Sequence, residues 1–247
     1  MYAIEGAALG VFLLVAIVVT AVIENQGSPV RQMIDSELLR RTIIGIAMGL
    51  TAAAIIYSPW GMKSGAHLNP AVTLSFFRLR KMNGADAAFY VAAQFAGAAL
   101  AMVLAALLLP ATAGAVNWVA TVPGPQGSWA AFAGEAVISF VMMAAILVLS
   151  NSMRTAPFTG AIASVLIAVY VIIEAPLSGM SMNPARSLAP AVAAGTLDSM
   201  WIYFVAPTLG MFMAAELYVR MCGWRAVHCA KLHHPSTGPC HFNCTPP

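Results

Sequence analysis

The polar residues with the most distinctive spacing form the tripeptide Asn-Pro-Ala, which occurs twice within apolar surroundings. The first copy is Asn69-Pro70-Ala71 and the second is Asn183-Pro184-Ala185. Asn is favoured as a helix cap, and Pro is favoured at the first helical position, where its missing N–H would have no partner. Each copy therefore predicts the start of a helix. The Asn amides could also donate hydrogen bonds to a passing oxygen atom, which is the chemistry of binding.

Bond-making chemistry is not indicated. No side chain looks like a nucleophile paired with a base, and His67, which lies just before the first tripeptide, has no carboxylate near it in sequence. We therefore expect that the protein is not an enzyme and requires no cofactor.

The composition is that of a membrane protein. The chain has 247 residues, 60% of them hydrophobic and only 9% charged, with a mean hydropathy of +0.82. Soluble domains carry roughly 25% charged residues, so this chain could not cover a water-facing surface. The net charge is +3 and the basic residues are scattered, which argues against nucleic acid as a partner. The expected partner is the lipid bilayer.

Six apolar segments approach or exceed the roughly 20 residues that span a bilayer. They cover approximately residues 4–23, 42–57, 85–109, 130–149, 158–173 and 200–221. Two shorter apolar segments, 70–77 and 184–193, each begin at an Asn-Pro-Ala tripeptide. They are too short to span, so we expect re-entrant half-helices. The fold class is an all-α membrane protein with six transmembrane helices and two half-helices.

The two halves of the chain are repeats, approximately 1–109 and 130–222, within one domain of residues 1–222. An offset of 114 places Ser64 on Ser178 and Asn69 on Asn183. Each half has three spans, an odd number, so the halves enter the membrane from opposite sides. Inverted repeats with interrupted helices place a site near the bilayer midplane.

The half-helices would then point their N-termini at each other, each with about half a positive charge. This meeting point would repel cations, including protons. Non-helical backbone at this depth must be buried in protein or line a watery cavity. The backbone carbonyls expected along the same path are those of Gly65, Ala66, His67, Leu68, Gly179, Met180, Ser181 and Met182.

The basic residues of the linkers predict the orientation. With both termini cytoplasmic, the inner loops and tail hold eight: Lys63, Arg78, Arg80, Lys81, Arg154, Arg220, Arg225 and Lys231. The outer side holds four: Arg31, Arg40, Arg41 and Arg186. This excess follows the positive-inside rule and predicts a multi-pass protein of the cell membrane, plasma or inner.

The motifs resemble those of one family. "SGAHLNPAVTLSFF" and "SMNPARSLAPAV" are similar to the two signatures of the aquaporin, or major intrinsic protein (MIP), family. "YVAAQFAGA" from Tyr90 and "WIYFVAP" from Trp201 resemble its third and last helices. The resemblance covers approximately residues 1–221. It implies an aquaporin-like right-handed helix bundle, a passive channel, and a homotetramer with one pore in each protomer.

The resemblance also implies roles for single residues. Glu5 and Glu135 match carboxylates that brace the re-entrant loops, and Arg186 matches the cation of a narrow selectivity filter. The other filter positions would be Val171, Met180, and either Met48 or Gly49, because the loop 57–64 is one residue longer than usual. This set lacks the usual aromatic residue and His.

Further positions, Ser187, Ala191, Tyr203 and Phe204, match the water-conducting members. The expected function is a channel for water and small uncharged solutes that excludes protons and ions. Three alternatives stay open: a channel like an aquaglyceroporin, or for a metalloid or another neutral solute; a structural or junction protein with a closed pore; and a metal-responsive channel gated by its tail.

Glu174 has two interpretations. It follows Val171 by three residues and so lies on a similar helix face. It would either line the outer vestibule and pair with Arg186, or be a solvated carboxylate at a helix end.

The tail, residues 223–247, is rich in Cys and His. The possible metal ligands are Cys229, His233, His234, Cys240, His241 and Cys244. Their C-x3-H and C-x3-C spacings suit Zn²⁺, and such clusters in a reducing cytoplasm more often bind metal than form disulfides. The alternative is a flexible tail with incidental thiols.

Overall fold

A computed structural model describes residues 1–233, 240 and 242–244 of the chain. In this part of the chain, six helices are apolar and long enough to cross a membrane, with α9 counted together with the short η2 (Ala156–Phe158). They are α1 (Tyr2–Glu24), α3 (Glu37–Tyr57), α6 (Gly84–Leu108), α8 (Ser128–Ser150), α9 (Thr159–Ile173) and α12 (Met200–Cys222). The all-α membrane fold and its six spans are confirmed.

The two tripeptides each begin a half-helix. These are α5 (Pro70–Arg78) and α11 (Pro184–Ala194), with Pro at the first position and Asn at the cap. The side chain of Asn69 accepts a hydrogen bond from the N–H of Ala71, and that of Asn183 accepts from the N–H groups of Ala185 and Arg186. The helix starts predicted from the residue types are therefore present.

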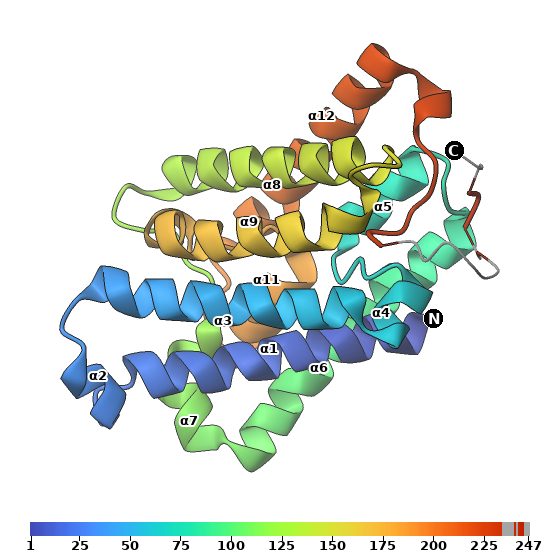
Figure 1. Cartoon of the computed structure of the whole chain (residues 1–247). Helices are drawn as coiled ribbons and strands as arrows, with labels where there is room; N and C mark the ends of the chain where they lie inside the picture. The colour runs from blue at the N-terminus through green and yellow to red at the C-terminus, as the bar shows by residue number, and fades with distance from the viewer. Residues whose placement is uncertain (234–239, 241, 245–247) are drawn as a thin grey trace.

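The N-terminus and the described part of the tail lie at the same end of the bundle, here called the terminal side; the other end is the distal side (Figure 1). The loop before α5 enters from the terminal side and contains α4 (Pro59–Ser64). The loop before α11 enters from the distal side and contains α10 (Ala175–Ser178). The two halves are thus inverted relative to each other, and α5 and α11 meet inside the bundle.

Small residues let the long helices approach closely. A Cβ on Gly97 of α6 would fall 2.0 Å from the carbonyl oxygen of Gly6 of α1, and a Cβ on Gly6 would fall 2.5 Å from that of Ala93 on α6. Gly45 of α3 lies against α9, where a Cβ would fall 2.6 Å from the carbonyl oxygen of Ala168. Close backbone packing of this kind stabilises helices in a bilayer, where burial of apolar surface contributes little. The outward faces expose large hydrophobic side chains such as Leu50 and Leu107, as lipid contact requires.

Three local features were not predicted from the sequence. Helix α3 starts five residues earlier than its apolar segment, because Ser36 caps it and its first turn is charged. The connection between α6 and α8 holds two short helices, α7 (Pro110–Ala115) and η1 (Asn117–Val119). The tail begins with η3 (Trp224–Ala226), and its residues Val227, Ala230, Leu232 and Phe242 are buried in the main core.

Candidate functional site

The two Asn side chains lie at the junction of α5 and α11. Each Oδ1 caps its own helix, and each Nδ2 reaches across to the opposite loop. Asn69 Nδ2 donates to the Met182 carbonyl at 2.7 Å, and Asn183 Nδ2 donates to the Leu68 carbonyl at 2.7 Å. An amide nitrogen carries two hydrogens, so each Asn retains one N–H for another acceptor. The junction therefore holds two fixed, neutral donors.

The loops before the two half-helices share an unusual backbone. Ala66 and Leu68 have positive φ values of 54° and 52°, and Met180 and Met182, their equivalents at the offset of 114, have 51° and 55°. L-residues adopt this region at a cost. The surrounding structure must therefore hold both loops in place.

Glu5 of α1 holds the first loop. Its carboxylate is fully buried and accepts hydrogen bonds from the Ser64 hydroxyl at 2.7 Å, the His67 N–H at 3.1 Å and the Leu68 N–H at 2.6 Å. Gln94 of α6 donates a further bond at 3.0 Å. Glu5 thus lies where the bracing role predicted for it can be performed.

Glu135 of α8 makes the equivalent contacts in the second half. It is fully buried and accepts from the Ser178 hydroxyl, the Ser181 N–H and the Met182 N–H, each at 2.7 Å. Three bonds to one carboxylate satisfy donors that have no water available at this depth. The two Glu residues therefore fix the two loops by the same set of bonds.

Some of the loop carbonyls are already occupied. Those of Leu68 and Met182 accept from the two Asn residues, and that of Gly65 accepts from the N–H of Leu232 in the tail. The acceptor path expected from the sequence is therefore only partly available to a passing molecule. The buried ring of His67 lies between the Thr73 hydroxyl and the Ala230 carbonyl. Because a carbonyl only accepts, Nε2 carries the proton, and Nδ1 accepts from Thr73.

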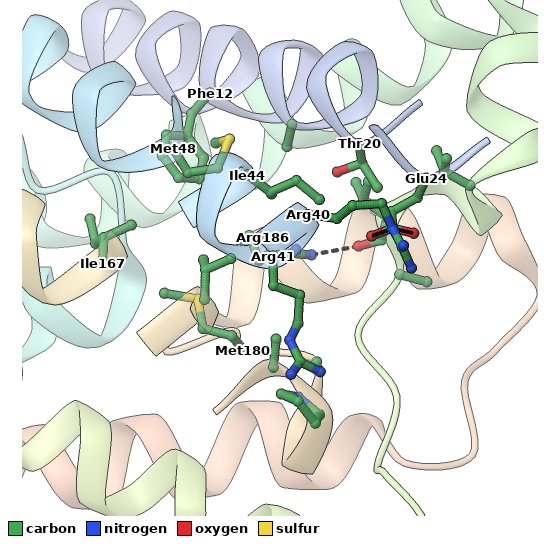
Figure 2. Close-up of a pocket in the computed structure, with 18 of the residues that line it drawn as sticks. Phe12, Thr20, Glu24, Arg40, Arg41, Ile44, Met48, Ile167, Met180 and Arg186 are labelled. Atoms are coloured by element: carbon green, nitrogen blue, oxygen red, sulfur yellow. Dashed lines mark hydrogen bonds and ion pairs between the residues drawn. The ribbon is translucent and has the colours of Figure 1, made fainter. Parts of the chain in front are cut away.

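A cavity of about 450 Å³ opens on the distal side (Figure 2). Among the residues that line it are four of the predicted filter positions, Met48, Val171, Met180 and Arg186. Gly49 is absent from the lining: a Cβ there would fall 2.7 Å from the Ser164 carbonyl oxygen on α9. Of the two residues between which the sequence left the choice open, Met48 lines the cavity and Gly49 packs against α9.

A second cavity, of about 120 Å³, lies beyond the first towards the terminal side. Its lining includes Asn69 and Asn183. The two cavities share four lining residues: Phe12, Ile167, Met180 and Arg186. This shared set, here called the constriction, lies at the boundary between the cavities. The guanidinium of Arg186 is held there by a 2.8 Å bond from Nη1 to the Val119 carbonyl.

Phe12 and Ile167 were not among the predicted site residues, although their spacing contained a signal. Phe12 follows the buried Glu5 by seven residues, which places both on one face of α1. Ile167 precedes Val171 by four residues and so shares its face of α9. Phe12 thus places an aromatic ring at the constriction, whereas the predicted filter residues include none.

Arg40 and Arg41 line the distal cavity, on the side where basic residues were expected to be few. Arg40 is buried and its Nε lies 3.0 Å from a carboxylate oxygen of Glu24; its Nη1 donates to the carbonyls of Ile34 and Asp35. Arg41 pairs with Glu37 at 2.7 Å. These partners explain how two adjacent cations are accommodated next to an apolar helix.

Neither interpretation of Glu174 is correct. The residue directly follows α9, and its side chain is only 5% exposed, so it is not solvated. It does not line the cavity next to Arg186, and among the described residues its carboxylate forms no ion pair with that side chain. It packs against α8, where a Cβ on Gly134 would fall 2.8 Å from its Oε1. Burial raises the pKa of Glu174 to about 8.

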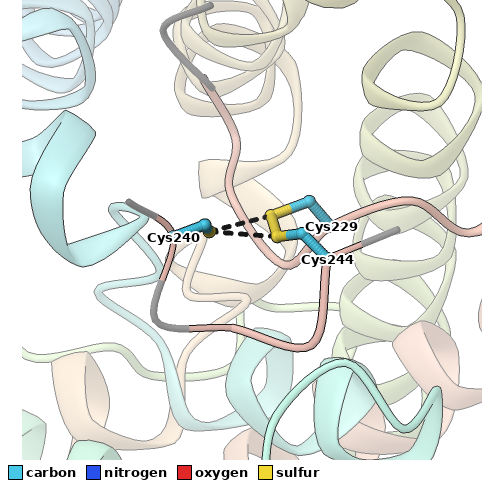
Figure 3. Close-up of side chains that lie close together, drawn as sticks. All are labelled: Cys229, Cys240 and Cys244. Carbon is cyan, nitrogen blue, oxygen red and sulfur yellow. Dashed lines mark hydrogen bonds between the residues drawn. A yellow bond between two sulfur atoms is a disulfide. The ribbon is translucent and has the colours of Figure 1, made fainter. Parts of the chain in front are cut away.

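The tail brings three of its predicted ligands together. The Sγ atoms of Cys229, Cys240 and Cys244 all lie within 4.8 Å of one another (Figure 3). Cys229 and Cys244 form a disulfide, contrary to the expectation of free thiols, and Cys240 Sγ lies 3.5 and 3.0 Å from their sulfur atoms. His233 instead packs on the ring of Tyr57. His234 and His241 lie outside the described residues.

Known proteins are similar to this chain in sequence or in fold. Residues 3–218 match the family model of the major intrinsic protein. The chain is 42% identical to aquaporin NIP2-3 of Zea mays over 175 residues, which cover 70% of this chain and 56% of that protein. It is 37% identical to the glycerol uptake facilitator protein-like 6 of Lactiplantibacillus plantarum over 176 residues, which cover 70% of this chain and 81% of that protein.

The chain thus spans little more than half the length of the maize relative that it matches. Among solved structures, it is similar to the aquaglyceroporin from Plasmodium falciparum, with a TM-score of 0.70 and 20% identity over 90% of this chain and 96% of that one. This likeness supports the fold, and the sequence match gives the family. The chain belongs to the major intrinsic protein family.

Proposed function

We propose that the protein is a passive channel that conducts water and small uncharged solutes and excludes ions and protons, without catalysing a reaction. The observation that carries this proposal is the pair of Asn donors at the meeting point of two half-helices, beside two cavities that share a constriction. A transported molecule would enter the distal cavity, pass Arg186, and reach Asn69 and Asn183 in single file.

The Asn pair suits a molecule with an exposed oxygen. Each Asn has one N–H left, and a water oxygen that accepted both would use both of its lone pairs. That oxygen could then accept no proton from the next water. A chain of hydrogen bonds along which protons could move would be interrupted at this point, while the water itself could pass.

Exclusion of cations is supported by fixed positive charge. The N-termini of α5 and α11 each carry about half a charge, and Arg186 adds a full one at the constriction. Positive charge of this kind sets an electrostatic barrier in a narrow pore. Neutral molecules would meet no such barrier.

The constriction supports more than one neutral substrate. Met180, Phe12 and Ile167 make it apolar except for Arg186, and a Met side chain adapts its shape easily. Conduction of small polyols is therefore a second candidate function, favoured by the absence of His from the filter and by similarity to a protein named as a glycerol uptake facilitator.

The placement in the membrane is part of the proposal. The excess of Lys and Arg on the terminal side supports cytoplasmic termini in the cell membrane. A homotetramer with one pore per protomer is inferred from family membership. Side-specific labelling of Cys222, which is exposed at the terminal side, tests the orientation, and the mass of the detergent-solubilised complex tests the tetramer.

Osmotic measurements on proteoliposomes test the function. Purified full-length protein, reduced and freed of metal, should accelerate vesicle shrinking in a sucrose gradient above protein-free vesicles. Swelling in an iso-osmotic glycerol gradient then decides between strict water conduction and the second candidate. Background water flux from protein with its full helical content would overturn the proposal.

A further inference from the structure

The three Cys residues of the tail lie beside the loop before α5, and the proposed pathway assigns them no role. Its three sulfur donors come from two stretches of chain, at Cys229 and at Cys240 to Cys244, and converge within 4.8 Å. All three residues are partly buried. Three convergent thiols are a recognised donor set for soft metal ions.

We propose that Cys229, Cys240 and Cys244, once reduced, bind one thiophilic divalent metal ion, such as Zn²⁺, and that the bound ion holds the tail against the loop before α5. Thiolate ligands lie about 2.3 Å from Zn²⁺, so tetrahedral geometry places sulfur atoms roughly 3.8 Å apart. The Cys240 sulfur already lies 3.5 and 3.0 Å from the other two, and reduction of the disulfide frees Cys229 and Cys244 to separate. A water molecule or another ligand would complete the coordination.

Metal binding requires that the Cys229–Cys244 disulfide is first reduced. A thiol reductant supplies two electrons and two protons to the Cys229–Cys244 disulfide and is itself oxidised to a disulfide. The two thiols so formed and the free thiol of Cys240 then release three protons as their thiolates bind the ion. The disulfide and the metal are thus alternative cross-links within the same 15-residue separation.

Residues next to the three Cys residues contact the loop before α5. The carbonyl of Ala230, adjacent to Cys229, accepts from His67 Nε2 at 2.6 Å. The N–H of Leu232 donates to the Gly65 carbonyl at 3.2 Å, and Leu232 lines the smaller cavity. The ring of Phe242 stacks on that of His67 with centroids 5.7 Å apart. A cross-link among the three Cys residues would therefore fix these contacts.

The flanking parts of the tail are anchored on the same side. The His228 N–H donates to Asn151 Oδ1 at 2.6 Å, at the end of α8. The Asn243 N–H donates to the Lys81 carbonyl at 3.0 Å, in the loop after α5. The cross-linked tail thus rests on three loops around the terminal-side end of the proposed pathway. The expected consequence, which rests on the proposed function, is that metal binding lowers water flux.

Titration with Cd²⁺ tests the metal site independently of transport. Reduced, chelator-treated full-length protein is titrated while the ultraviolet absorbance of Cd–thiolate bonds and the bound metal content are measured. We expect one ion per protomer in the wild type and in the control Cys222→Ser, whose thiol lies outside the cluster. Cys240→Ser should bind at least tenfold more weakly. Absence of binding to the wild type, or equal binding by Cys240→Ser, would overturn the site.

Flux measurements test its coupling to the pore. Zn²⁺ added to reduced proteoliposomes should lower water permeability at least twofold for the wild type and Cys222→Ser, and leave that of Cys240→Ser unchanged. Equal permeability with and without Zn²⁺, in protein shown to bind it, would overturn the coupling. A lack of water flux under every condition would count against the proposed function, while the Cd²⁺ titration would still decide the site.

Discussion

Arg186 is the only charged member of the constriction, and its side chain is fixed by the Val119 carbonyl. A single charge at a few ångströms contributes on the order of 1 to 4 kcal/mol at the dielectric of a watery pore or protein surface. That range corresponds to roughly a fivefold to thousandfold change in the rate at which a cation crosses. At the scale of the residue, the selectivity proposed here therefore depends mainly on this side chain.

Replacing Arg186 with Ala should accordingly admit small cations. We expect at least a fivefold rise in the permeability of proteoliposomes to methylammonium, with water flux unchanged or increased. Arg41→Ala is the matched control, because the charge of Arg41 is paired with Glu37 and lies outside the constriction. Cation flux that stays at background in Arg186→Ala would show that the barrier lies elsewhere.

The buried carboxyl group of Glu174 predicts a pH-dependent stability. Its pKa is about 8 in the folded protein, against an ordinary value of 4.5. Between these pH values the folded state keeps a proton that the unfolded chain has released, so the free energy of unfolding falls as pH rises. Thermal unfolding in detergent should show this decline in the wild type and a smaller one in Glu174→Gln. Equal slopes in the two proteins would contradict the assignment.

The loops before the half-helices depend on contacts between elements. Each buried Glu satisfies two backbone N–H groups and a hydroxyl, and leaving such donors unsatisfied costs about 1 to 3 kcal/mol each. Glu135→Ala should therefore lower the unfolding temperature strongly and abolish water flux. Glu135→Gln keeps one acceptor oxygen, so its unfolding temperature and water flux should lie between those of the wild type and of Glu135→Ala. A Glu135→Ala protein with normal stability and flux would contradict the bracing role.

The contact between α1 and α6 gives a second prediction at this scale. A Cβ on Gly97 would overlap the backbone at Gly6, and overpacking of this kind costs roughly 1 to 3 kcal/mol. Gly97→Ala should thus lower the unfolding temperature in detergent. Gly114→Ala is the control, because a Cβ there has no heavy atom within 4 Å. The same loss in both variants would argue against close packing as the cause.

At the scale of the whole molecule, the sequence predicted what depends on local rules or on the repeat. The half-helices follow from Asn and Pro at fixed positions, and the inversion follows from an odd number of spans. The environments that depend on packing between distant segments could not be predicted. The Val119 carbonyl next to Arg186 is 67 residues away in sequence, and the surroundings of Glu174 depend on how α9 meets α8. The contacts of the tail with Gly65 and His67 also join segments far apart in the sequence, so they could not be predicted either.

We propose that one pathway conducts water but not protons. Measuring water flux and proton flux on the same vesicles tests this most directly. Reduced, metal-free full-length protein is reconstituted with a pH-sensitive dye trapped inside, and water efflux and proton entry are recorded after osmotic and pH jumps. We expect water permeability well above that of protein-free vesicles, with proton entry at their background level. Background water flux, or proton entry that rises in step with water flux, would contradict it.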